Sequence, residues 1–562
     1  MHRLSKATAT LVLTATAGFG QLTLDQKISD FMNVAGIYDK NYGPYEWKRD
    51  ALGFDLLDVA PWLDKIAATK SDLDFYDVMV SYVASLNDAH DVYQIPSNFT
   101  ARLNFGVDIY DGKLLVDTIN RGRLPVAEFP FLIGYELVSI DGQDAPKILD
   151  GLLKYEIAAN PRSTRRLAAQ LLTIRPQSLI AHAIDVPEIS TVVFRRPDDK
   201  LESYRIPWTK VGLPLTSVGK FSTPNGFKRT RPKSVEDQPD DSDNNNPPDY
   251  MSPLSKLWNC QLPDRAVNGF GSPLPIFVNS LPASFRLRLL GDFLSGTFVA
   301  GPYTIGFIRI PNYTPADPTA ALVAFQKEIA FFKTNTDGLI IDEMRNPGGS
   351  VSYLNQLVSM LMPNTWRSIA FEVRATSYWI SSISSSYESA KAQGAPQVIL
   401  DQLLVIKNAL IAANLANRGR TEPIPLDDFT IDRPGTAAAY DKPLMVLIDE
   451  LSASGGDAFA ATIQDNGRGP LLGWRTMGAG GNVTGWEAGD YSLGSITVTQ
   501  SLMNRKNPIV TDDYPTAPYV ENIGVRPDIP VDYMTRENLT RSGQPFVDAF
   551  VAAMVDHIQK NK

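Results

Sequence analysis

Two segments of this chain share one design, in which a short hydrophobic strand is followed by a glycine-rich turn and then a helix. Residues 338–350 read GLIIDEMRNPGGS, and residues 444–457 read LMVLIDELSASGGD. Short apolar runs that alternate with helical segments predict an α/β layer architecture. Glycines let backbone N–H groups approach a ligand closely, and the following helix directs its positive end to the same place. Both turns are therefore candidate functional sites.

The second turn is a favourable position for a nucleophilic serine. Ser454 precedes two glycines whose amides could stabilise an oxyanion, each donor contributing about 3 kcal/mol in a transition state. Ordinary strand–helix turns use glycine in the same way, and the spacing is not that of the Gly-x-Ser-x-Gly elbow. The pattern alone leaves both interpretations open. No Gly-Lys-Ser/Thr follows either turn, which argues against phosphate binding.

The 562 residues divide by their patterns into successive regions. Helical spacing of apolar residues predicts an N-terminal helical region over 21–100, and short alternating runs predict a β-rich domain over 101–212 with a helical insertion near 163–174. Basic and then acidic clusters without apolar residues predict a flexible linker over 213–250. We assign the remainder, 251–562, to the α/β core.

The N-terminus is typical of an export signal. Residues 1–20 have a basic start, an apolar stretch and small residues near the end, and no later stretch suggests a membrane span. We therefore expect a soluble protein that is secreted, or periplasmic in a bacterium. The net charge of −9 disfavours nucleic acid as a partner. One cysteine and four scattered histidines indicate no metal or organic cofactor.

Several blocks resemble the tail-specific, C-terminal-processing serine peptidase superfamily. The blocks are residues 346–349, 452–454, 464–468 and 473–476. Most members use a Ser/Lys dyad, but the turn expected to hold the lysine reads Gly478-Ala479-Gly480, and no lysine lies between Ser454 and Lys506. The sequence is instead similar to a Ser/His/Glu branch that includes the chlamydial protease-like activity factor and the tricorn protease. Residues 86–90, 454–457, 478–481 and 520–525 carry that likeness.

The resemblance implies a serine endopeptidase that acts on polypeptides. Ser454 would be the nucleophile, His90 the general base and Glu521 the carboxylate that orients the imidazole. The N–H of Gly455 and one from Gly348 or Gly349 would form the oxyanion hole. The implied fold is a crotonase/ClpP-like core with an inserted PDZ-like domain, and a homodimer is implied as well.

The PDZ-like domain would bind an extended peptide at Phe105 and Gly106, beside a strand edge, although a purely structural β-domain is an equal alternative. The charged linker would be a site of self-cleavage. Ser452 is the rival nucleophile, Asp465 is expected to brace a helix end, and His182 is expected to be buried in the core. Two other functions stay open: a catalytically silent peptide- or ligand-binding protein on the same fold, and a crotonase-type acyl-CoA enzyme, which the export signal disfavours.

Overall fold

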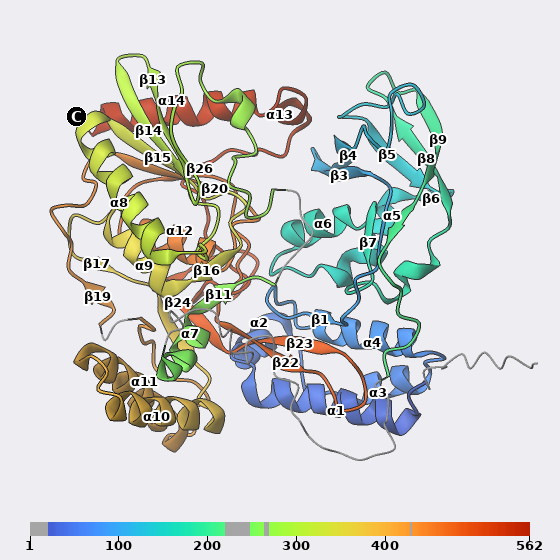
Figure 1. The fold of residues 1–562 in the computed structure, drawn as a ribbon, viewed down its shortest axis with the longest axis horizontal. Coiled ribbons are helices and arrows are strands. Elements are labelled where there is room, and N and C mark those ends of the chain that lie inside the picture. Colours follow the sequence, from blue (N-terminus) through green and yellow to red (C-terminus); the bar gives the residue numbers. More distant parts are fainter. Residues whose placement is uncertain (1–20, 220–247, 264–268, 428–429, 562) are drawn as a thin grey trace, which may run out of the picture.

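A seven-stranded sheet forms the centre of the C-terminal half of the protein (Figure 1). The computed structural model describes residues 21–219, 248–263, 269–427 and 430–561. From β14 onward, neighbouring strands of the sheet are parallel. In spatial order the strands are β12 (Arg286–Leu290), β13 (Leu294–Ala300), β14 (Tyr303–Arg309), β15 (Gly338–Asp342), β20 (Leu444–Ile448), β21 (Leu471–Gly473) and β26 (Ile529–Pro530). The carboxyl ends of β15 and β20 lie side by side, so the two glycine turns that follow them meet at one edge.

Both faces of the sheet are covered by helices, which explains why its strands are continuously hydrophobic. Leu339 and Ile341 pack into a cluster with residues of three helices, whereas Ile340 faces the opposite cluster. Successive side chains of a strand point to opposite faces, so each short run supplies both cores. The first face carries α8 (Pro318–Asn335), α9 (Val351–Ser359) and α12 (Gly455–Asp465), and the second carries α14 (Gln544–Lys560).

A smaller β-rich domain lies beside this core and has its own hydrophobic cluster. Its sheet is built from five strands in the order β3-β4-β5-β8-β9, with β6 paired to β5, and helix α6 packs against the edge strand β3. The bounds are β3 (Phe105–Tyr110), β4 (Lys113–Ile119), β5 (Glu136–Ile140), β6 (Gln143–Asp144), α6 (Pro161–Gln170), β8 (Ile189–Arg195) and β9 (Leu201–Pro207). The predicted helical insertion is α6.

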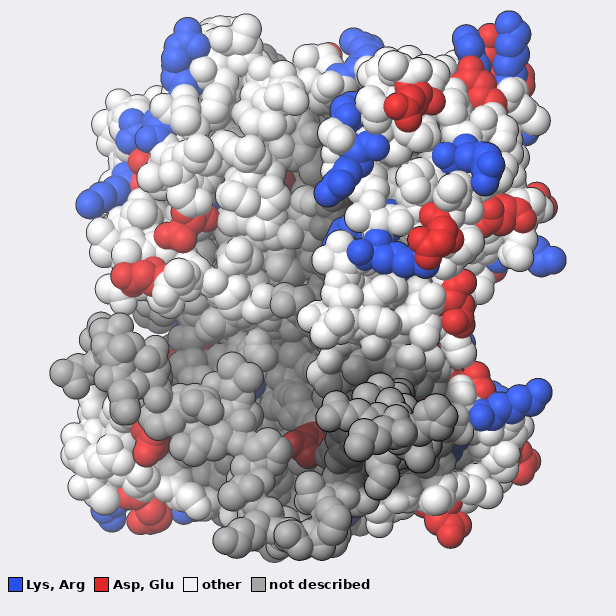
Figure 2. Space-filling model, turned by 45° about the vertical axis from the view of Figure 1, so that its right-hand side comes forward, with Lys and Arg blue, Asp and Glu red and all other residues white. Residues whose placement is uncertain are grey.

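Buried ion pairs join the β-rich domain to the core. Arg166 of α6 contacts Asp108 of β3 at 2.7 Å and Glu450 of the core at 3.1 Å, and all three side chains are 2% exposed. Arg162 contacts Glu450 and Asp532 at 2.6 Å each. A cavity of about 680 Å³ lies next to these residues, between the two parts. Figure 2 shows basic side chains along the β-rich side of this boundary.

The N-terminal region is helical, as its periodicity predicts, and is fixed to the C-terminal half. Its four helices are α1 (Leu24–Asn41), α2 (Tyr45–Leu52), α3 (Ala60–Ala67) and α4 (Asp72–Ala84). Strand β1 (Tyr93–Gln94) then pairs with β23 (Ser495–Thr499), which forms a hairpin with β22 (Val483–Glu487). In Figure 1 this red hairpin lies against the blue helices. Segments near residues 93 and 496 therefore lie side by side just after α4.

Several features of the structure differ from the sequence-based expectations, and two of the predicted segments lie mostly or wholly outside the described residues. Two helices, α10 (Ser377–Ala392) and α11 (Gln397–Leu415), were not predicted. By length and composition α11 could cross a membrane, contrary to the expectation that no later stretch would; 28% of its apolar window is buried in the structure, and Leu403 is among the buried residues. His182 is wrongly predicted as a core residue: its side chain is 41% exposed and lies near two carboxylates. The predicted export signal and most of the predicted linker lie outside the described residues.

Candidate active site

Ser454 lies at the start of α12 in a backbone conformation that is strained for any residue with a side chain. Its φ is 57° and its ψ is −108°. Conformations of this kind cost about 1–3 kcal/mol and persist where the surroundings enforce them, often at functional sites. The Ser454 N–H donates to Asp457 Oδ2 at 2.7 Å, and the Ala453 N–H donates to Asn346 O at 2.9 Å. The first bond lies within the second glycine turn, and the second bond joins this turn to the first glycine turn.

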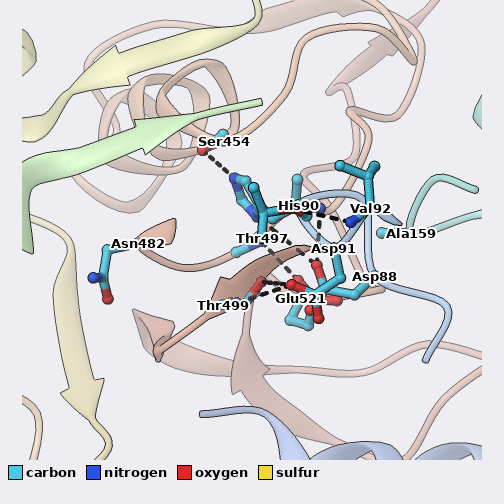
Figure 3. A network of polar contacts seen from close by, with 12 residues as sticks. Asp88, His90, Asp91, Val92, Ala159, Ser454, Asn482, Thr497, Thr499 and Glu521 are labelled. Atoms are coloured by element: carbon cyan, nitrogen blue, oxygen red, sulfur yellow. Dashed lines mark hydrogen bonds and ion pairs between the residues drawn. The ribbon is translucent and has the colours of Figure 1, made fainter. Parts of the chain in front are cut away.

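Ser454 and His90 are in direct contact. Ser454 Oγ lies 2.7 Å from His90 Nε2, although 364 positions separate the two residues in the chain (Figure 3). Both side chains are fully buried. A neutral imidazole nitrogen at this distance can accept the hydroxyl proton, so the pair meets the first geometric requirement for an activated serine nucleophile.

The backbone around His90 is held by the β22–β23 hairpin. The His90 carbonyl accepts a short hydrogen bond from Thr497 Oγ1, which itself accepts the Val92 N–H at 3.0 Å. The carboxylate of Asp91 accepts the Thr499 N–H at 2.9 Å. Figure 3 shows these contacts below the imidazole. The histidine is therefore placed by residues from the far end of the chain.

Glu521 lies in the same buried network, and both of its oxygens are occupied. Oε1 forms a short ion pair with Lys48 Nζ, and Oε2 accepts the Gly480 N–H at 2.8 Å. A second carboxylate, that of Asp88, lies beside the imidazole. Its Oδ1 is 3.9 Å from His90 Nδ1 and accepts the His90 backbone N–H at 3.0 Å. Asp88 is thus the acid beside the imidazole, while Glu521 is held by Lys48 and Gly480 in the same buried network.

Burial dominates the electrostatics of these acids. Desolvation, followed by the charge of Asp88, raises the pKa of Glu521 to about 8, and Lys48 opposes that rise. Desolvation and Asp88 also raise the pKa of Asp91 well above its usual value. Perturbed carboxyl groups around a histidine are typical of active sites, although structural ion networks produce them too.

The glycine turns place backbone amides beside Ser454. Gly348 has a φ of +94°, and a Cβ on it would lie 2.5 Å from the Gly455 nitrogen, so only glycine fits there. The Gly455 N–H makes no hydrogen bond within the part of the chain that the structure describes, and it begins a helix. The Gly348 N–H, in contrast, donates to Asn346 Oδ1 at 2.8 Å. Gly349, with a φ of +141°, packs tightly against the backbone of Tyr313.

Asp457 connects the nucleophile turn to the turn that carries the glycines of the 478–481 block. Its carboxylate accepts the N–H of Ser454, that of Gly478 at 2.9 Å and that of Ala479 at 3.0 Å. Burial raises the pKa of Asp457 to about 6, against these hydrogen bonds. Asp457 belongs to the 454–457 motif, but nothing in the sequence indicated its role. A buried acid bonded to three backbone amides is a positioning residue.

The remaining predicted residues lie elsewhere. Ser452, the rival nucleophile, donates to Glu343 O at 2.8 Å and is engaged within its own turn. Asp465 braces the end of α12 through Arg505. Phe105 and Gly106 begin the edge strand β3, beside a cavity of about 390 Å³, but the Phe105 ring packs among Phe131 and Phe194.

Lys48, Asp88 and Asp91 are charged members of the network to which the sequence assigned no role. Asp88 stands two residues before His90, so the motif around the histidine contained that signal. Lys48 lies in α2 among other charged residues, and nothing in its local pattern distinguishes it from a surface lysine.

A serine activated by an imidazole at the start of a helix, with a backbone amide directed to the same place, is the arrangement of a serine hydrolase. Comparison with known proteins narrows this class. Residues 304–531 match the model of Peptidase family S41, and residues 99–214 match that of a PDZ domain. The chain is thus a serine peptidase with an S41 domain and a PDZ domain.

Relatives cover nearly the whole chain at low identity. A protein of Chlamydia pneumoniae is 26% identical over 609 residues, spanning 98% of this chain and 93% of its own. The carboxyl-terminal-processing peptidase 3 of Arabidopsis thaliana chloroplasts is 30% identical over 143 residues, 23% of this chain and 25% of that protein. The crystal structure of mature CPAF is 22% identical with a TM-score of 0.73, covering 96% of this chain and 98% of that one. At 22% identity, this similarity shows that the two chains share a fold.

Proposed function

We propose that the protein is an exported serine endopeptidase with Ser454, His90 and Glu521 as its catalytic residues. Ser454 Oγ attacks the scissile carbonyl while His90 Nε2 takes its proton, and His90 then gives the proton to the leaving amine. Glu521 stabilises the imidazolium. Water hydrolyses the acyl-enzyme by the same steps in reverse order. The single observation that carries this proposal is the 2.7 Å contact between Ser454 and His90.

The oxyanion would be stabilised by backbone amides. The Gly455 N–H is the first donor, because it begins α12 beside the nucleophile. Gly348 or Gly349 would supply the second. Since the Gly348 N–H is bonded to Asn346 Oδ1, its use requires a local rotation of the first glycine turn.

Access to Ser454 requires a rearrangement, because both Ser454 and His90 are fully buried. Strand β11 (Asn259–Gln261) pairs with β16 (Gly348–Ser350), so one segment of the chain already covers the glycine turn beside the nucleophile. We propose that cleavage of the chain between Thr216 and Tyr250, ahead of β11, frees this turn for substrate. Most of that stretch lies outside the described residues.

Four further expectations belong to the same proposal. The α/β core is of the crotonase/ClpP-like type, the first twenty residues direct export, and two copies of the chain form a dimer. The PDZ domain binds an extended peptide along β3, which is an edge strand with the 390 Å³ cavity at its start. Phe105 and Gly106 would contribute backbone groups there, since the Phe105 ring is in the core.

Labelling with a fluorophosphonate probe tests the catalytic assignment. We expect covalent labelling at Ser454, located by mass spectrometry, and none in the Ser454→Ala variant. Ser452→Ala is the matched control, because that hydroxyl lies two positions away and makes other contacts. Folded protein that takes no label between about pH 6 and about pH 9, the range in which an imidazole base becomes neutral, would favour the silent binding protein.

Self-processing is tested by intact mass. Wild-type protein should be cut between Thr216 and Tyr250, whereas the Ser454→Ala variant should stay whole. Uncut chains in both samples would contradict the proposed activation by self-cleavage. This outcome would leave the assignment of Ser454 as nucleophile, which labelling tests, unaffected.

A further inference from the structure

Lys48 is a buried lysine whose contacts satisfy every proton of an ammonium group. Its side chain is fully buried, and Nζ donates to Glu521 Oε1, to Asn522 Oδ1 at 2.8 Å and to Asn87 O at 2.8 Å. Three donors thus meet three acceptors. A lysine is almost never fully buried unless it is paired, and a buried charge with complete hydrogen bonding is held in one geometry.

The surroundings of Lys48 and Glu521 are predominantly acidic. Asp88 and Asp91 come from the segment after α4, and both are buried. Other titratable groups that face this cluster are the imidazole of His90 and the hydroxyls of Tyr38 and Tyr42; the Tyr42 hydroxyl donates to Asp88 Oδ2 at 3.0 Å. One cation therefore lies among three carboxyl groups in a site that excludes water. Without it, a negative charge on Glu521 would have no countercharge nearby.

We propose that Lys48 is a positioning residue for the Ser454–His90 pair, holding Glu521 in place by their ion pair and favouring the ionised form of that carboxyl group. This inference rests on the proposed function. An ionised Glu521 stabilises the imidazolium that forms when His90 takes the serine proton; a protonated Glu521 does not. Lys48 touches no reacting atom and acts through Glu521.

The proposal predicts the sign of a pH effect. Burial and Asp88 raise the pKa of Glu521 to about 8, and Lys48 is the group that pulls it down. The labelling rate of the wild type should therefore rise with pH as Glu521 ionises. Removing the lysine charge raises the Glu521 pKa further, because an opposite charge in contact shifts a pKa by about 1–3 units. The rising limb should move to higher pH by that amount, and labelling at pH 7 should fall about tenfold or more.

The experiment compares Lys48→Met with wild type in fluorophosphonate labelling from about pH 6 to about pH 11, a range that includes a limb moved from about pH 8 by about 1–3 pH units. Lys113→Met is the matched control, since the ion pair of Lys113 with Glu136 at 3.1 Å is exposed, with half of the lysine side chain in solvent. We expect an unchanged limb in the control and a displaced limb in Lys48→Met. A Lys48→Met limb at the wild-type position would overturn the inference.

A second measurement covers the case in which Lys48→Met is too unstable to assay. Thermal unfolding of Lys48→Met is compared with that of the double variant Lys48→Met/Glu521→Gln. Because glutamine at position 521 needs neither a countercharge nor the uptake of a proton in the folded state, the double variant should melt at a higher temperature. Equal or lower stability of the double variant would mean that Lys48 only fills space, which refutes the proposal. A wild type that takes no label refutes the proposed function instead, so the two failures are distinguishable.

Discussion

Replacing Ser454 by glycine should give a more stable protein than replacing it by alanine. Both variants lose the Oγ contact with His90, so that loss cancels in the comparison. Alanine must keep the φ of 57° and ψ of −108°, a conformation that costs a residue with a side chain about 1–3 kcal/mol, whereas glycine adopts positive φ freely. The greater freedom of glycine in the unfolded chain takes back about 0.4–1 kcal/mol. At the middle of both ranges, the net advantage of glycine is about 1.3 kcal/mol.

Thermal unfolding of the two variants at one pH measures this difference. Since 1 kcal/mol shifts Tm by about 2–4 °C in a domain of 150–250 residues, the glycine variant should melt at least about 1 °C higher. Gly36, in the middle of α1 with open space around its Cα, is the control: there alanine should be the more stable residue by about 1 kcal/mol. An alanine variant at position 454 as stable as the glycine variant would refute the argument that the nucleophile turn is strained.

Two further substitutions test the site and the domain boundary. Gly348→Ala would place a Cβ 2.5 Å from the Gly455 nitrogen, so the rate of fluorophosphonate labelling should fall about 100- to 1000-fold. Gly36→Ala should label at the wild-type rate. Equal labelling rates for Gly348→Ala and wild type would exclude the Gly455 N–H from the oxyanion hole. Arg166→Met leaves the buried Asp108 without its ion-pair partner and Glu450 with Arg162 alone, and should lower the free energy of unfolding by about 3–5 kcal/mol. The exposed Arg165→Met should lower it by less than about 1 kcal/mol. The arginines also keep the pKa of Glu450 below 4.5 despite its burial. The free energy of unfolding of the wild type should therefore fall only as pH drops through the lowered pKa of Glu450, and that of Arg166→Met should depend less on pH. Chemical unfolding at several pH values measures both. An equal fall in the wild type and in Arg166→Met would contradict this prediction.

Local elements were largely predictable from the sequence because hydrophobic periodicity is a local signal. The strand predicted at residues 338–342 is β15, and the one predicted at 443–448 is β20 with one residue fewer. The helices expected after the two glycine turns are α9, which begins at Val351, and α12, which begins at Gly455. Helices α10 and α11 were not predicted, because the apolar residues of their sequences show only a weak helical periodicity and match no motif. His182 was misplaced because the apolar residues around it form an irregular turn rather than a core strand.

The charged residues around His90 could not be assigned from sequence. A lysine in α2 and an aspartate after α4 show no local sign of burial, and their role depends on which segments pack beside them. Lys48 meets Glu521 across 473 positions of the chain. Predicting that contact requires the tertiary packing, because electrostatic partners carry no periodicity.

The amino-acid sequence by itself determined the strand–turn–helix units, the glycines that only a close backbone approach explains, and a serine at the start of a helix. The tertiary structure alone decided that His90 reaches this serine, since the pairing of β1 with β23 brings together segments about 400 residues apart. It also decided which acid and which lysine surround the imidazole. The physical reason is that backbone conformation follows from neighbouring residues, whereas the position of a side chain in a buried network follows from how all the layers pack.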